Sequence, residues 1–213
     1  MRRILSSDVL TQVIVPQDLL DAVRSLNLHN PTEEAVFRYI VAVSIFNGIL
    51  VGLPGTLGWG VLIAQAIELL MAYQIGRMTG LLSYGQTFSP SGLIKMLSGL
   101  GVSALAVTQL FGLTLNAVFN TLSNVLPAIM PVSFAAVTIT TLAYGLFIYL
   151  VFSELAESER NKLSLLDMGR LAKKSYGYTK LLGSTLSKLL KEDAPRFYAE
   201  MKQSVSDCWY GVT

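Results

Sequence analysis

The stretches VFRYIVAVSIFNGILVGLP (36–54) and GWGVLIAQAIELLMAYQIG (58–76) decide the fold of this chain. Each is 19 residues long and holds one charged residue, Arg38 in the first and Glu68 in the second. A helix of about 19 residues spans roughly 28 Å, close to the hydrocarbon thickness of a bilayer. The connector between them contains Pro and Gly but no charge, which suits a tight turn. The two stretches therefore predict a helical hairpin.

Charge is scarce far beyond this hairpin. Between Arg38 and Glu154 lie 115 residues with three formal charges, Glu68, Arg77 and Lys95, while the other 98 residues hold the remaining 27 of 30. At the roughly 25% of an average soluble domain, the central region would carry about 29. Soluble folds place charges on their outer surfaces, whereas hydrocarbon excludes them. The pattern favours a membrane environment for the middle of the chain.

A second apolar hairpin follows a polar interval at 77–95. Its segments cover about 96–119 and 128–152, joined by the uncharged connector NTLSNVLP. We therefore expect an all-α membrane protein with two apolar helical hairpins, about four transmembrane helices, and amphipathic N- and C-terminal helices. The expected divisions are an amphipathic lead-in at 1–35, a membrane domain at 36–153 and a basic amphipathic cytoplasmic region at 154–213.

The lead-in contains its own helix signals. Pro16 begins a run in which Leu19, Leu20, Val23 and Leu26 share one face. Asn30 can then cap a new helix, with Pro31 in its first position and Glu33 completing a capping box.

The positions of the basic residues predict an orientation. The two connectors inside the hairpins hold no Lys or Arg, so four spans would place all sixteen bases on one side. The positive-inside rule then predicts a multi-pass protein of the cell inner membrane with both termini cytoplasmic. Two hairpins that dip into the bilayer from one side fit the same pattern.

The region after Glu154 is basic. Residues 160–191 contain eight Lys or Arg against one acid, Asp167, and apolar residues recur there at helical spacing. The predicted apolar face is Leu165, Met168, Ala172, Tyr176, Thr179, Leu182, Leu186 and Leu189. The predicted lipid or partner surface is Arg170, Lys173, Lys174, Lys180, Lys188 and Lys191. A solvated helix packed against the protein or a partner subunit is the alternative.

Three glycines, Gly169, Gly177 and Gly183, argue against one continuous helix here. Residues from Asp193 onward, which include Pro195, are expected to form a short separate helix.

Glu68 is the ionisable residue nearest the middle of an apolar segment. A carboxylate there must face the bundle interior, be protonated or meet water. It predicts a proton or cation site or a pore-lining ring, or else a hydrogen-bonded packing residue beside Gln65 or Tyr73. The candidate polar intramembrane residues are Glu68, Gln65, Asn47, Gln109 and Asn116.

Two small-residue pairs, Gly48 with Gly52 and Gly76 with Gly80, have the spacing that allows close helix contact. Packing within the hairpin is favoured over a dimer motif.

Residues for catalysis are scarce. One histidine, His29, and one cysteine, Cys208, give no catalytic constellation and no metal-ligand cluster, and no phosphate-binding loop is present. We therefore expect no enzyme, no cofactor and no metal. A net charge of +2 does not favour nucleic acid as a partner.

Five features resemble the membrane-associated domain of unknown function in YcjF-type proteins, also appended to some bacterial Era-like GTPases. They are Asn47-Gly48, Leu53-Pro54-Gly55, Gln65 with Met71, Ile75-Gly76 and Tyr84-Gly85. The likeness covers about 110 residues, to the end of the fourth apolar segment. It implies an all-helical membrane-associated module that works beside a GTPase, although this chain has no GTPase motif of its own.

These patterns favour a non-enzymatic membrane scaffold or adaptor, oligomeric or part of a membrane complex, whose basic C-terminal region binds anionic lipid or a cytoplasmic partner. One alternative is an oligomeric pore or membrane-permeabilising effector with Glu68 near the conduction path. Another is a soluble all-α protein with buried apolar hairpins that inserts on activation.

Overall fold

The computed structural model describes residues 15–26, 28, 31–52, 60–82, 132–158 and 163–210. Helices make up this part of the chain, and it contains no strand, so the all-α prediction is confirmed for the described residues. The helices are α2 (Gln17–Arg24), α3 (Pro31–Gly52), α4 (Gly60–Met78), α7 (Val132–Ser158) and α8 (Leu165–Tyr210). α3 starts at Pro31, as the sequence predicts, whereas the expected cap Asn30 lies outside the described residues.

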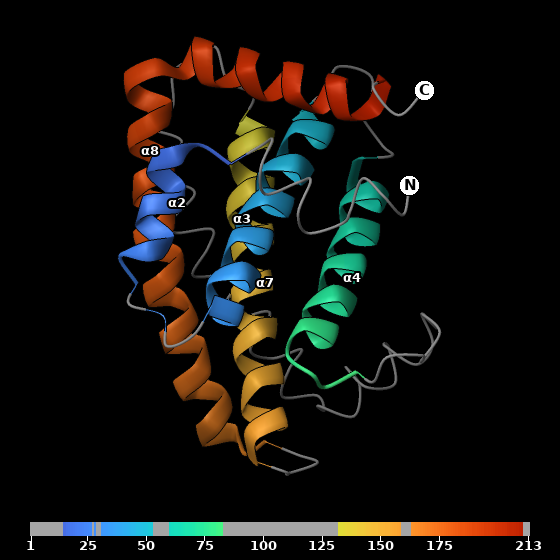
Figure 1. The fold of residues 1–213 in the computed structure, drawn as a ribbon, viewed down its shortest axis with the longest axis vertical. Helices are drawn as coiled ribbons and strands as arrows, with labels where there is room; N and C mark the ends of the chain where they lie inside the picture. Colours follow the sequence, from blue (N-terminus) through green and yellow to red (C-terminus); the bar gives the residue numbers. More distant parts are fainter. Residues whose placement is uncertain are drawn as a thin grey trace.

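The helices form a bundle in which α3 and α7 are central. α3, α4 and α7 run side by side, and α8 runs along α7 with the short helix α2 next to it (Figure 1). The last part of α8 then turns and crosses one end of the bundle (Figure 1). α2 and α8, which are far apart in the sequence, therefore lie on the same side of the bundle as covers of α3 and α7.

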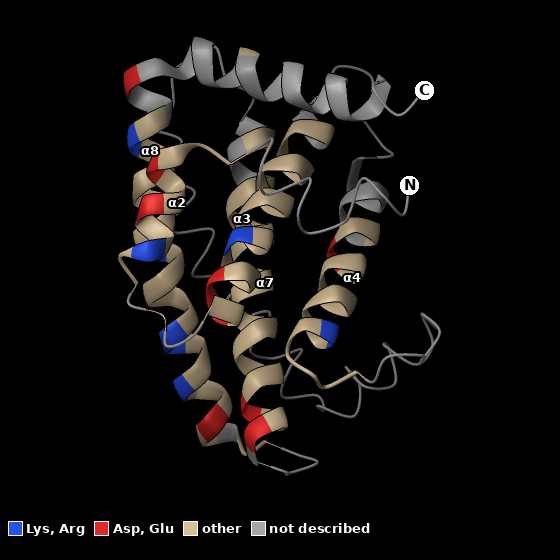
Figure 2. Cartoon of the chain, viewed as in Figure 1, with Lys and Arg blue, Asp and Glu red and all other residues tan. Residues whose placement is uncertain are grey.

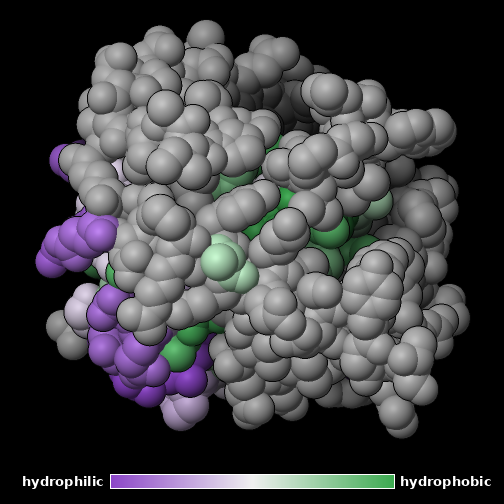
Figure 3. All heavy atoms as spheres, turned by 90° about the horizontal axis from the view of Figure 1, so that it is seen from above, coloured by the Kyte–Doolittle hydropathy of each residue, from purple (hydrophilic) through white to green (hydrophobic). Residues whose placement is uncertain are grey.

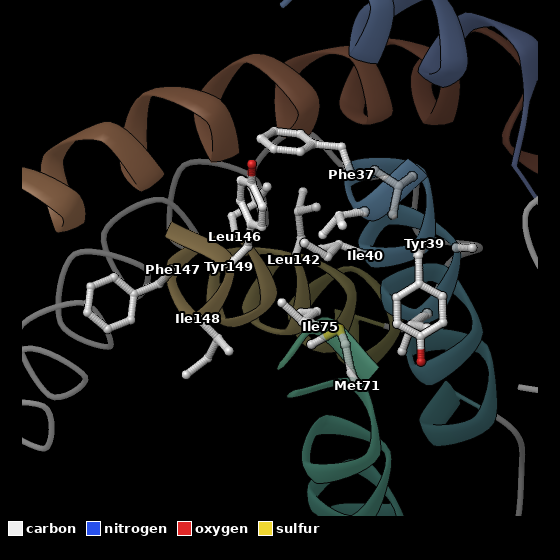
Figure 4. Close-up of a cluster of buried hydrophobic side chains, with 14 of the residues drawn as sticks. Phe37, Tyr39, Ile40, Met71, Ile75, Leu142, Leu146, Phe147, Ile148 and Tyr149 are labelled. Carbon is white, nitrogen blue, oxygen red and sulfur yellow. The ribbon is translucent and has the colours of Figure 1, made fainter. Parts of the chain in front are cut away.

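Long stretches of α3 and α7 are apolar and buried on every side. Residues 39–46 of α3 are all buried, and so are residues 146–152 of α7. A helix that is hydrophobic all round belongs in a protein core or in a membrane. Phe37 and Ile40 of α3 meet Leu142, Leu146 and Tyr149 of α7 beneath α8 (Figure 4).

α2 and α8 are amphipathic and cover the central pair with their apolar faces. Leu19 and Val23 of α2 are buried. Most charged residues of α2 and of the first part of α8 are exposed, while α3 and α7 are nearly free of charge where they are buried (Figure 2). From above, hydrophilic side chains gather on the side of α2 and α8 (Figure 3). The bundle thus presents a polar surface there.

The buried face of α8 differs from the predicted one. Its buried positions are Met168, Leu171, Ser175, Thr179, Leu182, Gly183 and Leu186. Tyr176, expected on the apolar face, is exposed, because the contact with α7 passes through the adjacent Ser175.

The predicted break in the C-terminal region is wrong. α8 is one helix of 46 residues that runs through Gly169, Gly177 and Gly183 and continues past Asp193. Contacts with α7 and α2 along its first part stabilise the helix against the low helical propensity of glycine. Pro195 removes one backbone donor, and it supplies a local cause for the change of direction.

Among the described residues, one stretch, Val137–Glu157 of α7, is long and apolar enough to cross a membrane. The core helix of a soluble protein meets the same criterion, and 67% of this stretch is buried. The third predicted span lies outside the described residues. The four-span arrangement therefore stays a prediction.

Candidate functional site

Two of the predicted intramembrane polar residues meet at one point, where α3, α4 and α7 come together. The side-chain amide of Asn47 donates to Thr141 Oγ1 at 2.8 Å. The Thr141 hydroxyl in turn donates to Glu68 Oε1 at 3.1 Å. One threonine of α7 thus links an amide of α3 to a carboxylate of α4, and we call these three residues the polar junction.

The polar junction lies inside apolar packing. Asn47 and Thr141 are fully buried, and Glu68 is partly buried. The amide oxygen of Asn47 is buried without a hydrogen-bond partner among the described residues. A buried polar atom without a partner costs free energy, so this oxygen lowers the stability of the fold. The hydrogen bonds of the junction connect three helices and fix them in one register.

Glycines allow the backbones to approach closely around this junction. A Cβ at Gly48 would collide with Thr138 Oγ1 and lie 2.9 Å from the carbonyl oxygen of Phe134. A Cβ at Gly145 would lie 2.7 Å from Ile40 Cγ2 and 3.0 Å from the Met71 side chain. The sequence reading identified Gly48 but missed Gly145, whose signal is a lone glycine within an apolar helical run.

The second glycine pair has two different roles. Gly76 lies against Leu82 and Phe152, as expected of a close helix contact. Gly80 lies in the turn that follows α4 and has a φ of 77°. A Cβ there would meet nothing within 4 Å. Its left-handed conformation lets the Leu82 amide donate back to the Gly76 carbonyl at 2.9 Å.

The polar junction can position a carboxylate and a hydroxyl, but it does not have the ligands of a metal site. No group of three or more His, Cys, Asp or Glu residues that could hold a metal ion occurs in the described part of the chain. The partner of Glu68 is Thr141, which the sequence reading did not single out. A threonine at the centre of a long apolar helix is the signal that could have identified it.

Aromatic contacts connect α8 to α3 and α3 to α7. The ring of Phe37 makes edge-to-face contacts with Tyr149 of α7 at 5.3 Å and with Tyr178 of α8 at 5.2 Å between centroids. The Tyr149 hydroxyl donates to Glu33 Oε1 at 2.7 Å, and Lys174 Nζ lies 5.8 Å from the centroid of the Tyr178 ring.

Polar contacts at two levels also join α8 to α7. Arg170 Nη2 donates to Glu154 Oε1 at 2.9 Å, and the Ser175 hydroxyl donates to the Ala143 carbonyl at 3.4 Å. These contacts place α8 alongside α7 over much of the candidate span.

Most of the predicted basic surface lies on the outward side of α8. The exposed bases are Arg170, Lys173, Lys174, Lys180 and Lys188. Arg170 also lies 3.6 Å from Asp167, and Lys188 lies 3.9 Å from Glu192. The lysines therefore lie at exposed positions of α8, whereas Arg170 also contacts Glu154 of α7.

Several candidate residues cannot be placed. Gln109 and Asn116 lie outside the described residues, and the side chains of Gln65 and Lys191 and the surroundings of Gly52 are not described. The structure therefore brings together Asn47 and Glu68 out of the five polar candidates. The resemblance to the YcjF-type domain stays a prediction. No protein-family model, curated protein or solved structure matches this chain.

Proposed function

We propose that this protein is a non-enzymatic, membrane-inserting protein that holds its most apolar helices in a covered form. In this form α2 and α8 cover α3 and α7. Insertion into a bilayer follows when α8 leaves α7. The observation that carries the proposal is the packing of the apolar face of α8 directly on the candidate span.

A docked α8 and a membrane-embedded α7 exclude each other. α8 runs beside α7 from the level of Glu154 to that of Ala143, with Lys173 and Lys174 exposed on its outward side. If α7 crossed a bilayer in this arrangement, those lysines would enter hydrocarbon, at about 2.5–3.5 kcal/mol each near the centre. Separation of the two helices removes this cost.

The opposite arrangement is equally unfavourable in water. Removal of α8 alone would expose the apolar side chains of α7, including Leu142, Leu146 and Tyr149. Burial of one such side chain contributes about 1.5–3 kcal/mol. The central pair thus has two favourable environments, the cover of α2 and α8 or the interior of a bilayer.

Few polar contacts would have to break for α8 to leave. Within the described residues, the polar contacts between α8 and α7 include an ion pair at Arg170, which is 63% exposed, and a hydrogen bond at Ser175. Exposed ion pairs contribute about 0–1 kcal/mol. Apolar burial is the main stabilising term, and a bilayer can replace it.

In the inserted state, the distribution of Lys and Arg would keep both termini on the cytoplasmic side of the inner membrane. There the freed C-terminal region would recruit a cytoplasmic partner, for which a GTPase is the class suggested by the resemblance. Assembly into an oligomer with Glu68 near a pore belongs to the same inserted state.

A constitutive four-span scaffold is the second candidate. The observation that favours it is the presence of three charges in the 115 residues between Arg38 and Glu154, many of which lie outside the described helices. It requires α8 to be permanently separated from α7. The two candidates therefore differ in whether α8 ever covers α7.

A reversible cross-link tests the proposal. In a Cys208→Ser background, Ala143→Cys and Ser175→Cys are combined, because Ser175 Oγ lies 3.4 Å from the Ala143 carbonyl oxygen. Phe37→Cys with Tyr178→Cys, joined by a short bismaleimide, gives an independent lock between α3 and α8. The oxidised or cross-linked protein is mixed with liposomes, and resistance to alkaline carbonate extraction measures insertion.

We expect the locked protein to stay extractable and the disulfide form to insert once reductant is added. The reduced double variant and the single-cysteine variants are the matched controls. Equal insertion of the locked and reduced forms would refute the covered form. Recovery of the chain only with detergent, with the two cysteines never close enough to react, would favour the constitutive scaffold.

A further inference from the structure

The outward face of α8 carries an unusual combination of side chains. Every exposed large hydrophobic residue in the described part of the chain lies on α8: Leu166 is 88% exposed, Leu181 42% and Tyr176 37%. These residues are separate from the apolar face that packs on α7. α8 therefore exposes apolar groups on the side that points away from the protein.

The exposed apolar residues and the bases share one arc of the helix. At 100° per residue, Leu166, Lys173 and Lys180 project within about 40° of each other, and Tyr176, Arg170 and Leu181 flank them. We call these six residues the outward face. Apolar and basic side chains thus alternate over one surface.

No acid interrupts the centre of the outward face. The sequence from Arg170 to Lys191 contains no Asp or Glu. Acids lie near its two ends, where Glu154 of α7 and Asp167 lie near Arg170 and Glu192 lies near Lys188. Neither Lys173 nor Lys180 forms an ion pair within the described residues, so both charges are available to a partner.

We infer that the outward face docks the protein on a bilayer surface that carries anionic phospholipid headgroups. The bases would lie near headgroup phosphates and carboxylates, while Leu166 and Leu181 enter the interface and Tyr176 lies at headgroup level. Charge complementarity selects an anionic partner, and the exposed leucines select an interface that can accept apolar side chains.

Docking on this face needs no release of α8. The inner face of the helix stays on α7 while the outward face meets the membrane, so the covered form itself can bind. The inference rests on the proposed function in one respect, because docking would bring the covered pair to the bilayer before insertion.

The test measures docking and insertion separately on the full chain. Flotation measures binding to phosphatidylcholine vesicles that contain either no phosphatidylserine or about 30% of it, as in an anionic membrane leaflet. Carbonate extraction of the same fractions measures insertion. Lys173→Gln with Lys180→Gln removes the two unpaired charges, and Lys173→Arg with Lys180→Arg retains them. Leu181→Ser removes one apolar contact.

We expect binding to require phosphatidylserine, to weaken with salt and to fall roughly fivefold for each base removed. The Lys→Arg double variant should bind like the parent protein, and Leu181→Ser should bind more weakly. Arg24→Gln removes a base from α2 and serves as the matched single-charge control for Lys173→Gln. Circular dichroism and thermal unfolding check that every variant remains folded.

Other results would overturn the inference. Equal binding to both kinds of vesicle would do so, as would equal losses for Lys173→Gln and Arg24→Gln. Binding of an acidic protein or an oligonucleotide through the same lysines, without vesicle flotation, would assign the face to that partner instead. Flotation without carbonate resistance would leave docking intact and reject the proposed insertion. Equal insertion by the parent protein and by the variant that combines Lys173→Gln with Lys180→Gln would reject docking alone.

Discussion

α7 and α8 lie side by side, yet they are opposite kinds of helix. α7 is buried around its whole circumference between residues 146 and 152, and this stretch has no charge. α8 has its buried residues on one side, and its bases lie on the other side together with three exposed apolar residues. A uniformly apolar helix has no preferred orientation toward water, whereas an amphipathic helix fits only a boundary. In the proposed function, α8 would therefore determine whether α7 lies in protein or in lipid.

Adjacent leucines of α8 provide the strongest test of this contrast. Leu182 is fully buried, whereas Leu181 is 42% exposed. We expect Leu182→Ala to lower the free energy of unfolding by about 3 kcal/mol, through lost burial and a cavity. Leu181→Ala should change it by less than about 0.5 kcal/mol. Urea unfolding in detergent-free buffer measures both, and equal losses would show that the inner face of α8 is not packed.

Glycines give the next largest effect. Gly48→Ala should destabilise the protein by about 2 kcal/mol, because the new Cβ would lie 2.9 Å from the Phe134 carbonyl oxygen and force α3 away from α7. Gly177→Ala on α8 meets nothing within 4 Å and should stabilise by about 0.5–1 kcal/mol. The same urea titration compares them. A neutral Gly48→Ala would mean that α3 and α7 are not in close contact.

Thr141→Val tests how much the polar junction contributes to stability. The variant keeps the shape of the side chain but leaves Asn47 and Glu68 without their shared partner, so we expect a loss of about 1–2 kcal/mol. Thr32→Val, at an exposed position of α3, is the control and should change stability by less than about 0.5 kcal/mol. Thermal unfolding followed by circular dichroism is the measurement. Similar losses for the two variants would contradict the junction.

The smallest effect is expected at the aromatic contact. Tyr149→Phe removes the hydroxyl that donates to Glu33 but retains the edge-to-face contact with Phe37, so about 1 kcal/mol should be lost. Tyr178→Phe retains its own ring contact with Phe37, and no hydrogen bond from its hydroxyl occurs within the described residues. We expect it to be close to neutral in the same thermal assay. A larger loss of stability for Tyr178→Phe than for Tyr149→Phe would contradict the stabilising role of the hydrogen bond from Tyr149 to Glu33.

The sequence predicted the apolar helices well but not the buried side of α8. Predicted segments at 36–54, 58–76 and 128–152 correspond to Pro31–Gly52, Gly60–Met78 and Val132–Ser158. Helical periodicity could not distinguish Ser175 from Tyr176 as the contact with α7. Nor could it predict Thr141 as the partner of Glu68, because that pair is separated by 73 residues.

The sequence alone predicted that the apolar segments now seen as α3, α4 and α7 are helical and avoid water, since charge is nearly absent over lengths that no exposed surface tolerates. It did not determine what replaces the water, because protein and lipid exclude charge equally well. Only the tertiary structure decided that α2 and α8 cover α3 and α7 and that Asn47, Thr141 and Glu68 meet. Both results depend on contacts between distant segments, which local patterns of hydrophobicity do not encode.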